Sequence, residues 1–226
     1  MLTGDIIRRS ADRFPDKTAV IWQDQRLTYR ELDQASNRFA QALTAAGLGK
    51  GDFIGMVCRN RIEYAIIFFG AAKAGTVLVN ISVQYTPEMF EYSLEKADVK
   101  CLFVETPFLD ATAGAVEKID ALARRVVIGA DSGTSGVSVD ETFEAFMDSA
   151  PSSDRVGVEL QPSDPFCMTF TGGTTGMPKG VLASHRNRDI TAHTVMVEER
   201  LEDTDVVAIV TPMFHVAALN IMFQPA

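Results

Sequence analysis

The sequence is poor in the residues that build disulfide and metal sites. Its 226 residues include three cysteines, three histidines and one tryptophan. Cys58, Cys101 and Cys167 lie far apart, form no CxxC pair and show no cysteine–histidine spacing of a zinc site. An odd number of scattered cysteines argues against a disulfide framework and favours buried, reduced thiols. We therefore expect a cytoplasmic location.

The chain also lacks an excess of positive charge. It carries 21 lysines and arginines against 30 aspartates and glutamates, which gives a net charge of −9. A nucleic-acid partner requires a basic surface, so no nucleic-acid binding is expected. An acidic surface does not exclude a nucleotide, because a lysine, backbone amides and a metal ion act locally.

Long uninterrupted hydrophobic runs are missing as well. Asp5, Arg8 and Arg9 interrupt the first residues, so the sequence predicts no secretory leader. The longest uncharged segment begins at Val206 and runs to the last residue, but a proline and several polar residues interrupt it. We therefore predict no transmembrane segment there. A buried strand followed by a loop and a helix is the expected structure.

The most informative segment that is present is FTGGTTGMPKG at residues 170–180. It combines glycines, threonines and one lysine directly after the apolar residues 166–168. Such a loop can turn its backbone N–H groups and hydroxyls around an anion, because glycine tolerates left-handed backbone conformations. Lys179 adds a positive charge for a phosphate. The segment predicts nucleotide binding.

This segment matches neither of two common nucleotide-binding motifs. A Walker A loop requires Gly-Lys-Ser/Thr at its end, whereas Lys179 lies between Pro178 and Gly180. The GxGxxG pattern of a dinucleotide fold is also missing. A solvent-exposed glycine-rich turn with a solvated lysine is the alternative when the segment is considered alone.

Helical and strand patterns alternate along the first half of the chain. Thr28 and Glu31 form a capping box for a helix that ends before Gly47. Apolar runs predict strands at 52–57, 76–80, 100–104 and 125–128, and helices at 63–73 and from Thr86 to about Ala97. Repeated strand–helix–strand units predict an α/β fold of layered, mostly parallel sheets flanked by helices.

The composition also suggests two subdomains. Residues 131–138 are rich in serine and glycine and predict a surface loop. Residues 150–154 contain a proline and two serines and are the best candidate for a linker. We therefore expect an N-terminal α/β subdomain over residues 1–150. Residues 151–226 would begin a second α/β subdomain that carries the phosphate-binding loop.

The pattern T-[SG]-G-T-T-G-x-P-K-G resembles the phosphate-binding loop of the adenylate-forming superfamily. This superfamily includes acid–CoA ligases, luciferases and the adenylation domains of peptide synthetases. The helix that begins after Thr28, the turn at 47–52 and the helix end at 70–75 are also similar to that family. The resemblance covers essentially the whole chain, which would be the N-terminal portion of a complete member and part of its large N-terminal domain.

The resemblance implies ATP and Mg²⁺ as ligands, with coenzyme A and a small-molecule carboxylic acid as further substrates. It implies that Thr171 through Lys179 hold the β- and γ-phosphates and that Thr171 lies near Mg²⁺. The implied phosphate-binding residues are Thr171, Gly172, Gly173, Thr174, Thr175, Gly176 and Lys179. No catalytic residue is assigned within the chain.

A second cluster, Thr211-Pro-Met-Phe-His-Val-Ala-Ala, resembles the family segment P-[LM]-[FY]-H-x-x-G that lines the acyl pocket. The resemblance places Phe214, His215 and Ala218 in the substrate pocket. Ala218 replaces the usual glycine and would narrow or reshape that pocket. His215 stands where amino-acid-activating domains typically have aspartate, which favours a fatty, aryl or other non-amino acid.

The remaining histidines and the tryptophan have simpler interpretations. Ser184 is expected to cap the next helix, so His185 is assigned a structural role. His193 lies within that helix and has no functional argument of its own. We expect Trp22 to belong to the core.

The sequence thus predicts the N-terminal part of an AMP-forming acid–CoA ligase of fatty acid or related metabolism. An adenylation domain that loads a carrier protein and a truncated, non-catalytic binding module are the alternatives. The chain ends inside an apolar stretch at 222–226, which predicts a truncation. The magnesium-binding glutamate, the ribose-binding aspartate and the C-terminal lysine of the family are missing from the sequence, so these 226 residues are expected to be inactive alone. A homo-oligomer is compatible with the sequence.

Overall fold

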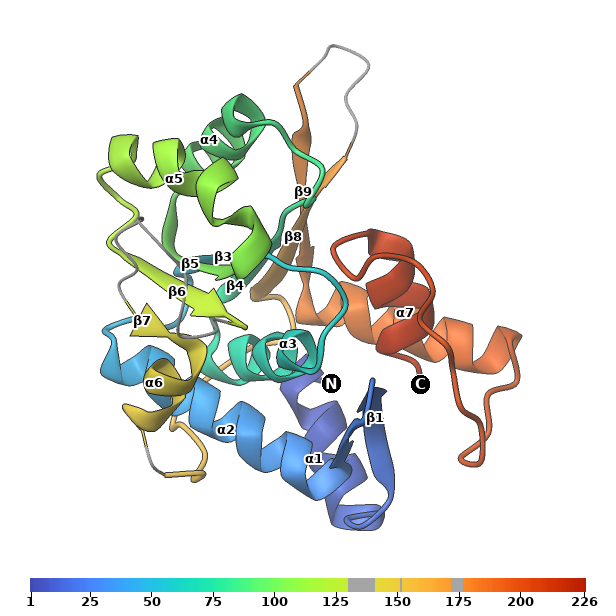
Figure 1. The fold of residues 1–226 in the computed structure, drawn as a ribbon. Helices are drawn as coiled ribbons and strands as arrows, with labels where there is room; N and C mark the ends of the chain where they lie inside the picture. Colours follow the sequence, from blue (N-terminus) through green and yellow to red (C-terminus); the bar gives the residue numbers. More distant parts are fainter. Residues whose placement is uncertain (130–140, 151, 172–176) are drawn as a thin grey trace.

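The computed structural model describes residues 1–129, 141–150, 152–171 and 177–226 (Figure 1). The predicted surface loop at 131–138 lies outside the described residues. So do five of the predicted phosphate-binding residues, Gly172 through Gly176.

A mostly parallel sheet forms the centre of the fold. Seven strands of the described chain pair in the order β7-β6-β5-β3-β4-β8-β9, and all are parallel to their neighbours except β9, which is antiparallel to β8. Their bounds are β3 (Phe53–Val57), β4 (Val77–Asn80), β5 (Val99–Glu105), β6 (Arg124–Ile128), β7 (Glu141–Thr142), β8 (Pro165–Thr171) and β9 (Lys179–Ser184). The predicted α/β class is confirmed.

Helices cover both faces of this sheet (Figure 1). They are α1 (Thr3–Arg13), α2 (Tyr29–Ala45), α3 (Ile62–Ala74), α4 (Pro87–Lys96), α5 (Leu109–Lys118), α6 (Phe143–Asp148) and α7 (His185–Glu198), with a 3₁₀ turn η1 (Thr106–Phe108) and a π-helical turn η2 (Ala218–Phe223). A separate antiparallel hairpin of β1 (Thr18–Trp22) and β2 (Gln25–Thr28) precedes α2.

The strands divide the core into two apolar layers, because successive side chains point to opposite faces of a sheet. In β5, Cys101 and Phe103 pack in the layer of α2, α3 and α6. Leu102 and Val104 pack on the other face, in the layer of α4 and α5. Strands buried on both faces explain the continuous apolar runs of the sequence.

The local signals at the helix ends are confirmed. Thr28 and Glu31 form the complete capping box of α2, and the Thr86 side chain accepts the N–H of Met89 at the start of α4. Helix α3 ends at Gly75, whose φ of 77° is the left-handed conformation that favours glycine.

The strand predicted after Val206 is wrong. Residues 206–210 belong to no strand, and Val206 and Val210 are 87% and 80% exposed. A strand needs a partner for its backbone groups, and no strand of the described residues pairs with this segment. The helix predicted to follow corresponds to η2, which lies against α7.

Strands from both sides of the predicted subdomain boundary at residue 150 join the same sheet. Strand β8 pairs with β4, so residues 165–171 extend the sheet formed by the first part of the chain. Residue 151 lies outside the described residues. The division into residues 1–150 and 151–226 stays a prediction.

Candidate functional site

The predicted phosphate-binding segment lies at the tip of the β8–β9 hairpin. Pairing of β8 with β4 ends at Thr169, whereas pairing with β9 continues to Thr171, which stands opposite Lys179. The hairpin therefore extends beyond the rest of the sheet, as Figure 1 shows. Its tip lies on the side of the carboxyl ends of the parallel strands, where open α/β sheets bind their ligands.

Thr171 and Lys179 form the base of this tip. Both are exposed, and the Thr171 hydroxyl donates to the Lys179 carbonyl at 3.4 Å. The Lys179 ammonium has no ion pair or hydrogen bond within the described part of the chain. An exposed ammonium group without a partner among the described residues can receive a phosphate.

Gly180 lies beside the Met168 side chain of the neighbouring strand. A Cβ atom at this position would lie 2.7 Å from Sδ of Met168, a distance at which one of the groups must move. Met168 packs partly buried on the α4–α5 layer, and its carbonyl accepts a hydrogen bond from Asn80. A side chain at the position after Lys179 would therefore displace the Met168 side chain.

The residues predicted for the substrate pocket lie in the segment 213–218. Met213 and Ala218 are buried, Phe214 is half-buried and His215 is exposed. The His215 N–H donates to the Pro212 carbonyl at 2.9 Å, and its Nδ1 accepts the N–H of Ala217 at 3.3 Å. Ala218 begins the η2 turn. No hydrogen bond or ion pair of the described residues joins this segment to Thr171 or Lys179.

Asn60, which the sequence analysis missed, anchors this segment to the sheet. Its Nδ2 donates to the carbonyls of Ile209 and Thr211 at 3.2 and 2.9 Å. Its Oδ1 accepts the N–H of Met213 at 2.7 Å. Asn60 follows β3, and about 150 residues of sequence separate it from its partners, so no local pattern could identify the contact.

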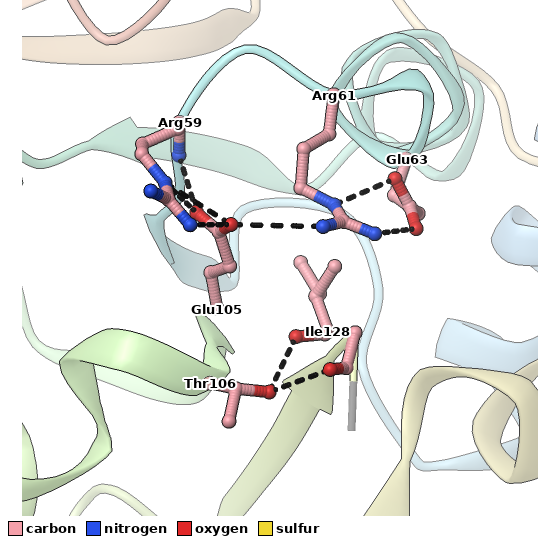
Figure 2. A network of polar contacts seen from close by, with 7 residues as sticks. Arg59, Arg61, Glu63, Glu105, Thr106 and Ile128 are labelled. Carbon is pink, nitrogen blue, oxygen red and sulfur yellow. Dashed lines mark hydrogen bonds and ion pairs between the residues drawn. The ribbon is translucent and has the colours of Figure 1, made fainter. Parts of the chain in front are cut away.

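Charged residues on either side of Asn60 fix the loop that carries it (Figure 2). Glu105, at the end of β5, accepts hydrogen bonds from the Arg59 N–H at 3.0 Å and from the Arg59 guanidinium at 2.7 Å. Arg61 pairs with Glu63 at 2.8 Å and approaches Glu105 at 3.6 Å. Burial alone would raise the pKa of Glu105, but the bonds from Arg59 hold that pKa below its ordinary value.

This loop lies where the connections of the sheet diverge. The chain leaves β3 toward β4 on one side, and it leaves β5 toward β6 on the other. Such a divergence opens a crevice at the carboxyl ends of the strands. Here the ion pairs of Arg59 and Arg61 with Glu105 occupy it.

A cavity of about 420 Å³ lies between β1 and residues 204–209. Asn60, Arg61 and Trp22 are among its lining residues. The Arg61 guanidinium lies 4.6 Å from the centre of the Trp22 ring, and Trp22 is half-buried. Trp22 lines this cavity and belongs to neither apolar layer of the described core, so the expectation that it is a core residue is wrong.

A family model described as AMP-binding enzyme matches residues 7–226. The chain belongs to the AMP-binding enzyme family. The predicted resemblance to adenylate-forming enzymes is confirmed, and the match covers both the β8–β9 hairpin and the segment anchored by Asn60.

Relatives of this AMP-binding chain carry ligase names. A medium/long-chain-fatty-acid–CoA/3-oxocholest-4-en-26-oate–CoA ligase of Mycobacterium marinum is 34% identical over 187 residues, which are 81% of this chain and 34% of that protein. A fatty acid–[acyl-carrier-protein] ligase of Streptomyces coeruleorubidus, ScoC, is 33% identical over 215 residues, 92% of this chain and 38% of that protein. The chain thus spans little more than a third of the length of these relatives.

The same fold occurs in a solved structure of a proposed long-chain-fatty-acid CoA ligase from Rhodopseudomonas palustris. The two structures superimpose with a TM-score of 0.89 at 25% identity, over 100% of this chain and 55% of that one. The predicted placement of the chain in the N-terminal part of such an enzyme agrees with this coverage.

Two histidines of the AMP-binding chain lie outside the candidate site. The predicted Ser184 cap of α7 is confirmed as a capping box with Asn187. His185 is fully buried, its ring stacks on Phe166 at 5.1 Å, and its Nδ1 accepts the N–H of Thr3. Burial lowers the pKa of His185 to about 4, so the ring is neutral at pH 7. His193 is exposed on α7.

The described residues of the AMP-binding chain contain no cluster of three or more histidine, cysteine, aspartate or glutamate side chains that could hold a metal ion. Thr171 is the residue predicted to lie near Mg²⁺, and its exposed hydroxyl is a ligand type that Mg²⁺ accepts. None of the helices described is both long and apolar enough to cross a membrane.

Proposed function

We propose that the chain is the N-terminal part of an ATP-dependent, AMP-forming acid–CoA ligase. The single observation that carries this proposal is the sequence 170–180 at the tip of the β8–β9 hairpin, in a chain of the AMP-binding enzyme family. The names of the relatives support an acid as the substrate and a thiol as the acceptor.

In the proposed reaction, a carboxylate oxygen attacks the α-phosphorus of ATP. The bond from that phosphorus to the bridging oxygen breaks, and pyrophosphate leaves with its electron pair. The thiolate of CoA then attacks the acyl carbonyl, and AMP leaves. Both steps depend mainly on positioning and on neutralising phosphate charge.

The hairpin would supply this neutralisation. Lys179 would donate to the phosphates, and Thr171 would contact them from the opposite strand. The predicted roles of Gly172, Gly173, Thr174, Thr175 and Gly176 belong to the same proposal. Mg²⁺, when bound, would neutralise phosphate charge that one lysine cannot balance.

The segment 213–218 would form one wall of the acid site. Met213 and Ala218 are buried and fix its two ends, while Phe214 and His215 lie between them with more exposure. An exposed imidazole beside a half-buried aromatic ring suits a substrate with a carboxylate and an apolar body. This supports a fatty or aryl acid over an amino acid.

A carrier protein is the second candidate acceptor. The ScoC relative carries a name that specifies an acyl carrier protein, and its identity of 33% is close to the 34% of the CoA ligase relative. Both acceptors present a thiol to the acyl-adenylate. All three cysteines are buried thiols outside any disulfide, which supports a reducing, cytoplasmic location for either enzyme.

The test is ATP–pyrophosphate exchange with a panel of carboxylic acids, on the full-length gene product that carries this chain. Acid-dependent exchange, followed by AMP and an acyl-CoA thioester, supports the proposal. Release of ADP contradicts it, and transfer to a carrier protein alone supports the second candidate. Absence of exchange with every acid favours a non-catalytic binding module. These 226 residues alone are expected to give no exchange.

A further inference from the structure

We propose that Asn60 is a positioning residue for the segment Thr211–Ala218, and that it sets the place of the acid in the site. The effect on acid binding rests on the proposed function. The structural effect on the segment does not, because the hydrogen bonds that carry it are independent of any reaction.

The amide of Asn60 matches three backbone groups of this segment. Two carbonyls, of Ile209 and Thr211, accept from its Nδ2, and the N–H of Met213 donates to its Oδ1. The reversed orientation of the amide would place an NH₂ group against the Met213 N–H and an oxygen against two carbonyls. The three partners therefore fix the orientation and require an amide rather than a carboxylate.

The Asn60 amide satisfies backbone groups that pairing with a neighbouring strand would otherwise satisfy. Within the described residues, the backbone of 206–211 makes hydrogen bonds to Asn60 and to no other group. Extended backbone without a partner strand has few ways to keep its register. The buried Met213 side chain anchors the segment in the core. The bonds to Asn60 fix the register of the segment relative to the sheet.

The loop of Asn60 is itself held firmly. Glu105 accepts from the backbone and side chain of Arg59 and pairs with Arg61 (Figure 2). The Arg61 guanidinium also lies against the Trp22 ring. Side chains from β5, α3 and β1 thus converge on the two neighbours of Asn60. A rigid support is what a positioning group requires, since an error of about 1 Å can cost a large factor in rate.

Movement of the segment at Thr211 or Met213 would be passed to His215. The His215 N–H donates to the Pro212 carbonyl, so the turn 212–215 moves as one unit. Among the described residues, no hydrogen bond joins Asn60 to β8 or β9. Loss of the Asn60 contacts should therefore disturb the acid and leave ATP binding largely unchanged.

The first test is hydrogen exchange at the Met213 amide in this chain. Asn60→Ala removes all three bonds, and Asn60→Asp keeps an acceptor but places a charge against two carbonyls. Both should raise Met213 exchange at least about tenfold at pH 7. At lower pH, the Met213 amide of Asn60→Asp should regain part of its wild-type protection from exchange, because a protonated carboxyl group can donate to the Thr211 carbonyl. The same amide in Asn60→Ala should regain none.

Two further variants serve as comparisons. Asn187→Asp makes the same chemical change in the α7 capping box, where the carboxylate can still accept from Ser184, so Met213 exchange should stay at the wild-type rate. Glu105→Gln removes the charge that holds the Asn60 loop without touching the segment, and should raise exchange less than Asn60→Ala. Unchanged exchange of α3 amides in each variant identifies a folded chain.

If the Met213 amide exchanges its hydrogen at the wild-type rate in both Asn60 variants, the proposal is overturned.

The second test is steady-state kinetics of the full-length protein. Asn60→Asp should raise KM for the acid at least about tenfold and KM for ATP less than about twofold. Equal changes in both constants would overturn the role in acid positioning. If the full-length wild-type protein shows no ATP–pyrophosphate exchange, the proposed function is contradicted. Hydrogen exchange at Met213 then still decides the structural role of Asn60.

Discussion

Gly70 of α3 lies directly against Phe39 of α2. A Cβ atom at Gly70 would be 2.5 Å from Cδ1 of Phe39 and 2.9 Å from the carbonyl oxygen of Ser36. Both neighbours belong to one helix, and one of them is backbone, so neither can move without shifting that helix. The packing of α2 on α3 thus depends on the missing side chain. This packing also places the start of α3, which directly follows the loop of Asn60.

Replacement of Gly70 by alanine should destabilise the protein despite the higher helix propensity of alanine. Overpacking of this kind costs about 1–3 kcal/mol. Gly114 of α5 is the matched control, because a Cβ atom there meets nothing within 4 Å. Gly114→Ala should stabilise by about 0.5–1 kcal/mol. Urea unfolding of both variants measures the difference, and a stabilised Gly70→Ala would contradict the close approach of the helices.

His185 should make the fold sensitive to mild acid. Its pKa is lowered from 6.5 to about 4 in the folded chain. Between these values the unfolded chain binds a proton that the folded chain does not, so stability is complete above pH 6.5 and falls as the pH decreases toward 4. The loss from this one group is about 3 kcal/mol at pH 4. Burial is the main cause, and it outweighs the opposing effect of the Asp164 and Asp5 charges.

The measurement is urea unfolding at pH 7 and pH 4.5. His185→Gln keeps an acceptor for the Thr3 N–H but cannot gain a charge, so its stability should fall by about 2 kcal/mol less than that of wild type. His193→Gln, an exposed site on the same helix, should follow wild type. Identical pH dependence of wild type and His185→Gln would show that the buried ring does not titrate in this way.

Lys179 should act on ATP and not on the fold. Its ammonium is exposed and lacks a partner among the residues described, so Lys179→Met removes no stabilising bond. In the full-length protein, KM for ATP should rise about 10- to 100-fold, the range for loss of one charge-assisted hydrogen bond. Lys96→Met, at an exposed position of α4, removes the same charge and should leave KM for ATP unchanged. An unchanged KM in Lys179→Met would remove this residue from the phosphate site.

Elements whose ends carry their own signal could be predicted from the sequence. The caps at Thr28, Thr86 and Ser184 and the stop at Gly75 each depend on residues within one helical turn. The β3, β4 and β5 runs were predicted to within two residues, because strands buried on both faces form continuous apolar stretches. The α/β class followed from their order.

Contacts over long sequence distances could not be predicted. The apolar pattern after Val206 suits a strand, but only a neighbouring strand converts such a pattern into one. Asn60 looks like any polar loop residue until the fold places Thr211 and Met213 beside it. Its position just after an apolar strand, at the carboxyl edge of a parallel sheet, was the available signal.

Arg188 of α7 is buried without an acidic partner in the described structure. Its Nε donates to Gln224 at 2.9 Å, its guanidinium lies 5.4 Å from the centre of the Phe68 ring, and Nη2 has no bond. Burial lowers the pKa of Arg188, which reflects the cost of keeping the charge away from water. Nε2 of Gln224 is also buried without a partner. The pair should therefore weaken the fold relative to an apolar replacement.

The double variant Arg188→Met/Gln224→Leu should be more stable than wild type by about 1–3 kcal/mol, because it removes both buried polar groups together. Each single variant should be less stable than wild type, since it leaves the other group buried without its bond, at a cost of about 1–3 kcal/mol. Urea unfolding of the four proteins gives a double-mutant cycle that isolates the coupling of the two residues. If the double variant is less stable than wild type, the buried arginine stabilises the fold through its contacts with Phe68 and Cys167, and the desolvation cost is the smaller effect.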